Sequence, residues 1–441
     1  MPYDPKRHAE RRAAVAAEMR RHGGGVMLLP AADEKLRNAD NEYLFRQDSD
    51  FFWLTGFEEP QGCALLFADP PPGRPRFAMF VRPRDRDKEI WTGRRAGVEG
   101  AKADFGADEA HPLAEMESRL EEYLDHPGPL WFRLGRDREW DERVARLLSR
   151  LRDKERTGVR VPRATIDHGA ILHEMRLVKS AHEVERLRRA VEITAEAHLG
   201  AMRDGRPGAR EYQVQSEIEY AFRRRGGSGP GYGTIVAAGA NACILHYRAG
   251  EAVLREGDLC LVDAGGEYRL YTADVTRTFP VSGTFTPPQR EVYDAVLAAQ
   301  LEGLAAVKPG ATIDGIHELA VRHLTGSMVR LGLLQGSVEE RIADASYKRY
   351  YMHRTSHWLG MDVHDVGAYY LDGKSRSLAA GMVLTVEPGL YVAPDDEKAP
   401  ERLRGIGVRI EDDVLVTEDG GEVLTAAIPK APQDVEACCT R

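Results

Sequence analysis

The chain has 441 residues, of which 42% are hydrophobic and 30% are charged, and its formal net charge is −9. This composition predicts a folded globular protein and excludes the basic surface needed to bind nucleic acid or an anionic membrane, so we expect neither partner. The length predicts two domains. Residues 1–25 lack the apolar core of a secretion signal, which predicts a cytoplasmic location.

The first third of the chain mixes helical patterns with short apolar strands. Residues 26–29 and 76–81 are expected to be strands, with a proline-rich loop at 69–75 between them. We therefore expect residues 1–176 to form an α/β domain.

The remaining residues, 177–441, are expected to form a second domain of the α+β class. A long helix is expected to begin at Lys179. Its apolar positions recur at steps of three and four residues: Val184, Leu187, Val191, Ala195 and Leu199. Strands are expected at 259–263, 271–279, 382–387 and 408–416, and helices at 286–306 and 312–333.

The cysteines at positions 63, 243, 260, 438 and 439 are odd in number and lack the paired spacing of metal ligands. Disulfide frameworks belong mainly to small secreted domains. We therefore expect free thiols.

Two aspartates stand where a strand seldom places a charge. Asp263 follows the apolar run 259–262 and precedes Ala264 and two glycines, so it either starts a turn or is a buried ligand. Asp274 lies inside the predicted strand 271–279, where alternation places it on one face with Thr276 and Thr278. This face is either an ordinary solvated surface or part of a site.

Two glutamates stand in similar positions. Glu387 follows the apolar run 382–386 and precedes a Pro-Gly turn. In the predicted strand 408–416, alternation places Arg409, Glu411 and Asp413 on one face. A surface ion-pair ladder is the alternative explanation for this face.

Three histidines, His353, His357 and His364, crowd residues 352–367. The spacing of the first two matches a helical zinc pair, but Arg354 replaces the Glu expected after the first His, and Gly360 argues against a continuous helix. We therefore do not favour a single helical zinc site.

Charge balance favours two divalent ions. Asp263, Asp274, Glu387 and Glu411 carry four negative charges, which two divalent cations neutralise, and His357 is a neutral fifth ligand candidate. Oxygen ligands favour manganese, magnesium or calcium, and a histidine shifts the preference toward manganese, cobalt or zinc. We expect two manganese ions, with cobalt and zinc as alternatives.

The segments around these residues resemble the pita-bread metallopeptidases, the family of methionine aminopeptidase, prolidase and aminopeptidase P. The segments most similar to aminopeptidase P are TIVAAG (234–239), ILHY (244–247), VDAG (262–265), DVTRTFP (274–280), SHWLG (356–360), VHDVG (363–367) and TVEPG (385–389). Those in the first third are RN (37–38), Asp40, RQ (46–47), SDF (49–51), TGF (55–57) and EIWTG (89–93). The resemblance covers nearly the whole chain. It implies a C-terminal pita-bread domain that follows an N-terminal domain of the aminopeptidase P type.

The resemblance also implies roles for individual residues. The implied metal ligands are Asp263, Asp274, His357, Glu387 and Glu411. The residues implied to contact substrate are His246, His364, which would stabilise the tetrahedral intermediate, and His353. Those implied to support the site are Arg409, Tyr391 and Asp40, in a network behind the metals, and Trp91, which resembles a tryptophan from a neighbouring subunit of a homotetramer or homodimer.

The implied reaction releases the N-terminal residue from peptides with proline in the second position. Two metal ions lower the pKa of water so that hydroxide forms at neutral pH, and Glu387 is expected to act as general base and then as general acid. The alternatives are prolidase, which releases proline from dipeptides, and a non-catalytic peptide-binding module of the same fold. Arg354 is the reason for retaining prolidase as an alternative. The family usually has a small residue there, and a cation would hold the carboxylate of a dipeptide.

Overall fold

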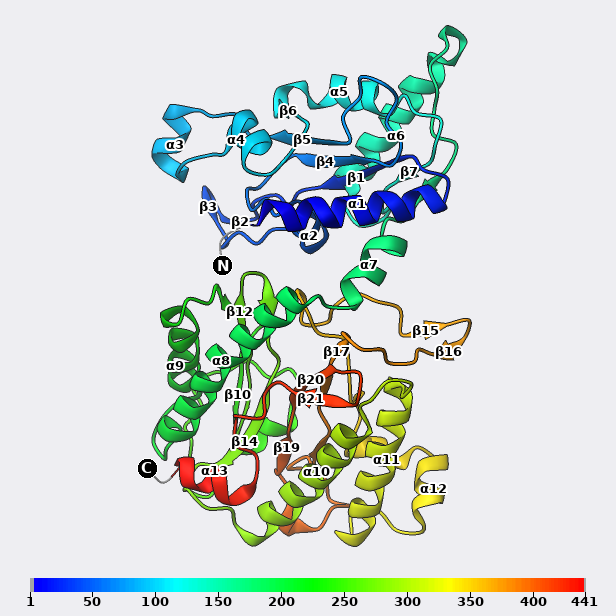
Figure 1. Cartoon of the computed structure of the whole chain (residues 1–441). Helices are drawn as coiled ribbons and strands as arrows, with labels where there is room; N and C mark the ends of the chain where they lie inside the picture. Colours follow the sequence, from blue (N-terminus) through cyan, green and yellow to red (C-terminus); the bar gives the residue numbers. More distant parts are fainter. Residues whose placement is uncertain (1–3, 440–441) are drawn as a thin grey trace. The chain divides into compact units, whose positions relative to one another are not determined.

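The computed structural model describes residues 4–439, and the chain divides into two compact units, Met1–His173 and Glu174–Arg441 (Figure 1). The helix α7 (Gly169–Leu177) spans this division. The domain boundary expected between residues 176 and 177 lies at the end of α7 and stays a prediction.

The N-terminal unit is an α/β domain built on one mixed sheet. Its strands are β1 (Val26–Pro30), β2 (Leu36–Asn38), β3 (Asn41–Glu42), β4 (Cys63–Phe67), β5 (Phe77–Val81), β6 (Glu109–Pro112), β7 (Leu130–Trp131) and β8 (Thr165–Ile166). Its helices before α7 are α1 (Pro5–Arg21), α2 (Ser49–Thr55), α3 (Arg86–Thr92), α4 (Gly97–Ala103), α5 (Met116–Tyr123) and α6 (Arg138–Asp153). The six-stranded sheet has the order β6-β5-β4-β1-β7-β8, and β2 and β3 form a separate hairpin. The expected strands at 26–29 and 76–81 are therefore confirmed as β1 and β5.

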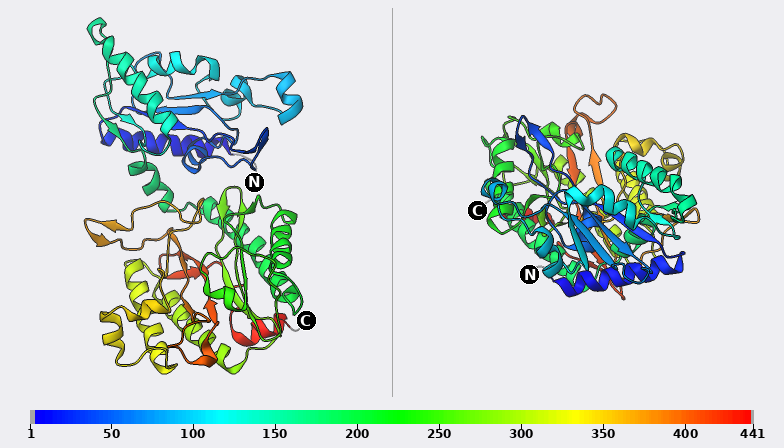
Figure 2. Two further views of the ribbon diagram at one scale, coloured as in Figure 1. Left: turned by 180° about the vertical axis from the view of Figure 1, so that it is seen from behind. Right: turned by 90° about the horizontal axis from the view of Figure 1, so that it is seen from above.

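Helices cover both faces of this sheet (Figures 1 and 2). Val26 and Leu28 of β1 pack in one buried core with Trp140 and Leu147 of α6. The intervening residues of β1 point to the other face, which α1 covers. Because both faces of the sheet are covered, the sequence of β1 is a continuous apolar run instead of an alternation of apolar and polar residues.

The C-terminal unit is an α+β domain with several small antiparallel sheets. Its helices after α7 are α8 (Ala181–Asp204), α9 (Glu211–Arg224), α10 (Pro287–Ala306), α11 (Ile313–Arg330), α12 (Val338–Ala343) and α13 (Pro432–Cys439). Its first six strands are β9 (Gly229–Pro230), β10 (Ile235–Ala238), β11 (Leu259–Asp263), β12 (Gly266–Tyr268), β13 (Tyr271–Thr272) and β14 (Thr276–Pro280). The others are β15 (Tyr370–Leu371), β16 (Lys374–Ser375), β17 (Val383–Val386), β18 (Gly389–Tyr391), β19 (Gly407–Arg409), β20 (Asp412–Val416) and β21 (Gly421–Val423). The two helices expected at 286–306 and 312–333 are confirmed as α10 and α11.

Two helix pairs enclose the strands of this unit. The pair α8 and α9 covers the sheet β10-β11-β14, and the pair α10 and α11 packs against the strands β17 to β20 (Figure 1). In β11, Cys260 and Val262 face the first helix pair, so alternation turns Leu261 and Asp263 to the opposite side. The ends of β11 and β17 thus carry carboxylates toward the space between the two helix pairs.

The long helix α8 begins two residues later than expected. Ser180 and Glu183 form a capping box at its start, which satisfies backbone groups that the helix leaves unpaired. Leu187 and Val191 are buried, whereas Leu199 is exposed. The buried stripe continues through Ala197 and Ala201, so the expected helix is confirmed while the last apolar position of its pattern lies outside the core.

Two of the expected strands are broken in the structure. The segment 271–279 divides into β13 and β14, and the segment 408–416 divides into β19 and β20. At the first break the N–H of Asp274 donates to a side-chain oxygen, Oδ2 of Asp413, at 3.1 Å instead of to a backbone carbonyl. At the second break the N–H of Glu411 donates to the carbonyl oxygen of Thr276 at 3.1 Å. The sequence predicted that Asp274 and Glu411 lie within strands. This was wrong, because both residues lie between strands.

Candidate metal centre

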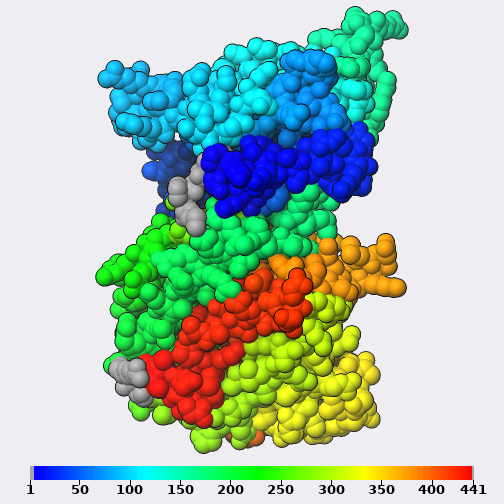
Figure 3. Space-filling model, in the orientation of Figure 1, coloured from blue at the N-terminus to red at the C-terminus, as the bar shows by residue number. Residues whose placement is uncertain are grey.

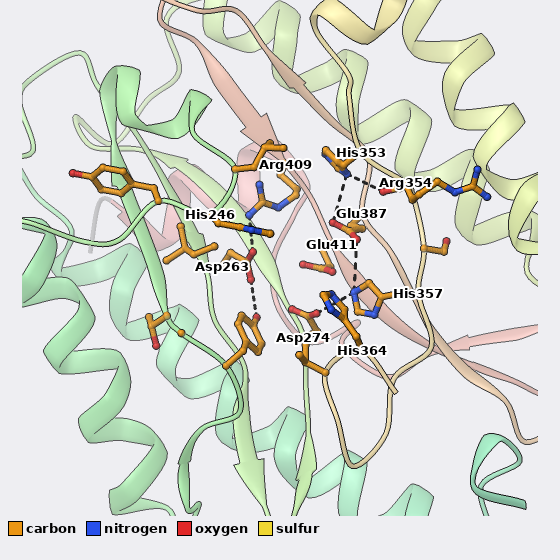
Figure 4. A pocket seen from close by; sticks show the side chains of 18 of the residues that line it. His246, Asp263, Asp274, His353, Arg354, His357, His364, Glu387, Arg409 and Glu411 are labelled. Carbon is orange, nitrogen blue, oxygen red and sulfur yellow. Dashed lines mark hydrogen bonds and ion pairs between the residues drawn. The ribbon is translucent and has the colours of Figure 1, made fainter. Parts of the chain in front are cut away.

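A cavity of about 1110 Å³ lies in the C-terminal unit. Nine of the site residues predicted from the sequence line this cavity. They are His246, Asp263, Asp274, His353, His357, His364, Glu387, Arg409 and Glu411 (Figure 4). They come from strand ends and loops that are far apart in the sequence. The structure therefore brings the five predicted ligands into one site.

The tightest cluster in this cavity is formed by Asp274, His357 and Glu411. Each offers one ligand atom, and these atoms lie within 4.8 Å of one another. Nε2 of His357 is 3.3 Å from Oδ2 of Asp274 and 3.7 Å from Oε1 of Glu387. The four residues thus surround a common point, as ligands of a metal ion must.

The ring of His357 is oriented for metal binding. Its Nδ1 donates to the carbonyl oxygen of Trp358 at 3.1 Å, which leaves Nε2 facing the carboxylates. Burial alone would lower the pKa of His357, but the hydrogen bond with Asp274 and the charges of Asp274 and Glu387 outweigh it and raise the pKa to about 9. The carboxylates therefore favour a positive charge at Nε2, which a bound cation supplies in place of a proton.

Asp263 lies at the other side of the cluster and is held by two donors. Its Oδ1 accepts a hydrogen bond from Tyr232 at 2.7 Å, and its Oδ2 accepts one from Arg409 at 2.6 Å. Arg409 also donates to the hydroxyl of Tyr391 at 3.1 Å, and that hydroxyl lies 2.9 Å from Nε2 of His353. The predicted residues Arg409 and Tyr391 therefore form a continuous chain of hydrogen bonds from Asp263 to His353.

Burial shifts the acidities of the carboxylates. It raises the pKa of Glu387 to about 7 and raises the pKa of Glu411 and of Asp413 well above the ordinary range. The charge of Asp274 adds to the effect in each case. Acids that are crowded in this way stay ionised only when positive charge lies close to them.

Divalent cations fit this set of residues. Asp413 adds a fifth carboxylate and Arg409 one positive charge, so the formal charge of the ionised cluster stays at −4. Among the described residues, Oδ1 of Asp413 is buried without a hydrogen-bond partner. An oxygen-rich donor set with one imidazole suits manganese, cobalt or zinc.

Two further predicted histidines flank the cluster. The rings of His364 and His357 meet edge to face with their centroids 4.5 Å apart. Burial lowers the pKa of His364 below its usual value, which favours the neutral form of its ring. His246 lies on the side of the cluster opposite Arg354 (Figure 4). Both histidines line the cavity, where they are accessible to a bound peptide.

The helical zinc pair is excluded by the structure. His353 and His357 lie in an irregular segment that contains no helix. Nε2 of His353 hydrogen bonds with Tyr391, while Nε2 of His357 faces Asp274. The two imidazoles therefore do not point at one ion.

Two predicted residues belong to the N-terminal unit. Asp40 lies at the exposed turn between β2 and β3, and Trp91 is an exposed residue of α3. The residues that line the cavity all belong to the C-terminal unit. The supporting roles of Asp40 and Trp91 therefore stay predictions.

Tyr232, which hydrogen bonds to Asp263, was missed by the sequence reasoning. It lies between two glycines, Gly231 and Gly233, in a segment without apolar periodicity. A Cβ on Gly231 would lie 2.0 Å from Oγ1 of Thr272, so this glycine is required by close packing. The Gly-Tyr-Gly pattern was the available signal that this turn is closely packed.

The chain matches the models of two protein families. Residues 185–418 match metallopeptidase family M24, and residues 8–131 match the N-terminal domain of aminopeptidase P. The chain therefore belongs to metallopeptidase family M24. It is a hydrolase with the pita-bread fold, as the sequence motifs predicted, and this family implies divalent metal ions.

Similar proteins align with nearly the whole chain. The Xaa-Pro aminopeptidase of Escherichia coli K12 is 45% identical over 427 residues, covering 97% of this chain and 96% of the relative. Human Xaa-Pro aminopeptidase 3 is 34% identical, covering 91% and 78%. The structure of Pseudomonas aeruginosa aminopeptidase PepP has a TM-score of 0.96 at 45% identity, covering 99% and 98%. A variant of E. coli aminopeptidase P in complex with substrate has a TM-score of 0.95 at 44% identity, covering 100% and 99%.

Within the described residues, no helix is both long and apolar enough to span a membrane. The five cysteines are free thiols, as expected, and two of them, Cys63 and Cys260, are buried.

Proposed function

We propose that this chain removes the N-terminal residue from peptides whose second residue is proline. The observation that carries this proposal is the single cavity that joins a buried cluster of carboxylates and one histidine to three further histidines. The Xaa-Pro aminopeptidases that align with nearly the whole chain support the same reaction. The cavity volume of about 1110 Å³ is large enough for a peptide of several residues.

The proposed cofactor is a pair of divalent ions, with manganese as the first choice and cobalt and zinc as alternatives. The residues proposed to hold them are Asp263, Asp274, His357, Glu387 and Glu411. When bound, such ions polarise the scissile carbonyl and lower the pKa of water.

The residues of the chain then supply proton transfer and orientation. Glu387 lines the cavity with its Oε1 3.7 Å from Nε2 of His357, and we propose that its carboxylate takes a proton from the attacking water and returns it to the departing proline nitrogen. His364 is proposed to donate to the carbonyl oxygen as negative charge develops there. His246 and His353 are proposed to contact the peptide.

A peptide series tests this function. We would compare kcat/KM for Ala-Pro-Ala, Ala-Pro and Ala-Ala-Ala with manganese present. Fastest cleavage of Ala-Pro-Ala supports the proposal. Fastest cleavage of Ala-Pro would make the chain a dipeptidase, and fastest cleavage of Ala-Ala-Ala would remove proline from the specificity.

We also propose that the partner is a second copy of the chain, in a homodimer or homotetramer. The β2–β3 hairpin and α3 lie on one side of the N-terminal unit (Figures 1 and 3). Both elements expose large apolar residues. Leu36 of the hairpin is 66% exposed and Trp91 of α3 is 87% exposed. Exposed apolar surface of this kind marks a contact with another protein. Sedimentation of the wild type and of Trp91→Ala tests the proposal, since the wild type should be oligomeric and the variant should dissociate more readily.

The proposed location is the cytoplasm, which the free thiols support because reducing compartments keep cysteines unpaired. Fractionation of cells followed by immunodetection of the chain would check this.

A further inference from the structure

The loop that carries His246 is long and has little regular structure. It connects β10 to β11, and after a short 3-10 helix (Gly239–Cys243) it runs without secondary structure past His246 and Tyr247. Both residues line the cavity. A histidine that contacts substrate from such a loop requires the loop to be held in one conformation.

One buried side chain contacts this loop on both sides of His246. Glu211 is the first residue of α9 and is 0% exposed. Its Oε1 accepts hydrogen bonds from the N–H of Ala238 and from Nδ2 of Asn241, both at 2.9 Å. Its Oε2 accepts from the hydroxyl of Tyr247 at 2.9 Å and from the N–H of Gly250 at 3.0 Å.

The chemistry of this contact suits a carboxylate. An ionised carboxylate only accepts hydrogen bonds, and its two oxygens can receive all four of these donors. Glutamine at this position would replace one acceptor with an NH₂ group, which would face donors. Glu211 is therefore matched to its site by charge and not only by size.

The backbone around Glu211 holds the returning part of the same loop. The N–H of Glu211 donates to the carbonyl oxygen of Ala252 at 3.0 Å, and the N–H of Tyr212 donates to that of Gly250 at 3.2 Å. Nδ2 of Asn241 also donates to the hydroxyl of Tyr247 at 3.0 Å, which links the two limbs of the loop directly. Both limbs thus meet at the start of α9.

We propose that Glu211 is a positioning residue for the reaction, which acts by fixing the loop so that His246 faces the bound peptide. Glu211 does not touch the substrate itself. This inference rests on the proposed function only in that His246 contacts the peptide.

A double-mutant cycle tests the proposal. We would measure kcat and KM at saturating manganese for the wild type, Glu211→Gln, His246→Ala and the double variant, using the peptide that the wild type cleaves best. Glu211→Gln should lower kcat/KM by about tenfold, and in the His246→Ala background the same change should lower it by less than about twofold. A residue that only stabilises the fold would give equal losses in both backgrounds.

Two further variants sharpen the test. Glu217→Gln removes an exposed carboxylate from the same helix and should leave kcat/KM unchanged. Tyr247→Phe removes one of the four donors without leaving an unpaired buried charge, so it carries the cycle if Glu211→Gln does not fold. Manganese content and the thermal midpoint of each variant show whether the metal centre and the fold are intact.

Three results would overturn the proposal. These are equal losses in the two backgrounds, wild-type activity of both Glu211→Gln and Tyr247→Phe, or wild-type activity of His246→Ala. Because the cycle uses whichever peptide is cleaved best, a failure of the proline preference is detected separately by the peptide series.

Discussion

Replacing Thr276 by valine should weaken metal binding without disturbing the fold. Thr276 is fully buried, and its hydroxyl donates to Oε2 of Glu411 at 2.7 Å and accepts from Nε of Arg409 at 3.1 Å. Valine keeps the shape and removes both hydrogen bonds. A hydrogen bond to a charged group contributes about 1.5–3 kcal/mol, so the dissociation constant for manganese should rise by about 10- to 100-fold.

The effect should also depend on pH. Burial already raises the pKa of Glu411 well above the ordinary range. The hydroxyl of Thr276 favours the ionised carboxylate, so its removal raises the pKa further and makes protons stronger competitors of manganese. We therefore expect the loss of affinity to be larger at low pH than at high pH. Activity measured against buffered free manganese at several pH values provides this measurement.

Thr278→Val is the matched control for this prediction. The Thr278 hydroxyl is equally buried, but it contacts only the backbone of Arg409, at 3.0 Å to the oxygen and 3.2 Å from the N–H. Its loss should affect stability more than metal affinity. Equal manganese affinities for the Thr276 and Thr278 variants would refute the reasoning, since the carboxylate contact would then have no effect on the metal.

Three other predictions concern the metal ions, the general base Glu387 and the buried residue Arg277. Chelation should abolish activity and added manganese should restore it, because crowded carboxylates repel one another without cations; full activity after thorough chelation would contradict this. Glu387→Gln should lower kcat by at least about a hundredfold while a folded, metal-loaded protein remains, and near wild-type turnover would show that another group moves the proton. Arg277 is fully buried, pairs with Asp412 at 2.7 Å and also donates to four backbone carbonyls, so Arg277→Met, which leaves these acceptors unpaired, should lower the free energy of unfolding by about 3–5 kcal/mol in urea titrations. A decrease in the free energy of unfolding below about 1 kcal/mol would contradict this prediction, since that is the contribution of an exposed ion pair.

Much of the fold follows from local patterns in the sequence. The continuous apolar run of β1 and the helical patterns of apolar residues in α10 and α11 were sufficient to predict these elements. Alternation also placed Thr276 and Thr278 on one face, and both side chains contact Arg409. Periodicity was informative wherever neighbours along the chain decide burial.

The same periodicity failed where distant residues decide the backbone conformation. Asp274 and Glu411 each lie at a break in a predicted strand, where the N–H of Asp274 bonds to the carboxylate of Asp413 and that of Glu411 bonds to the carbonyl oxygen of Thr276, both far away in the sequence. The role of Glu211 could not be predicted for the same reason. This residue begins an ordinary amphipathic helix, and the four groups that donate hydrogen bonds to its carboxylate lie up to 39 residues away. The contacts that shape the site are long-range, so the residues could be recognised from motifs but their geometry could not.

The position of Arg354 bears on the choice between tripeptide and dipeptide substrates. A site for dipeptides needs a cation that is free to hold the carboxylate of proline, because an unpaired buried charge is costly. Arg354 lines the cavity, but its guanidinium forms an ion pair with Asp314, and its side chain points away from the carboxylate cluster (Figure 4). Tyr370, on the projecting β15–β16 hairpin, donates to the same carboxylate at 3.1 Å (Figure 3). Because Asp314 already engages this cation, we expect that Arg354 does not hold the carboxylate of a dipeptide and that the cavity accepts peptides that continue beyond the proline.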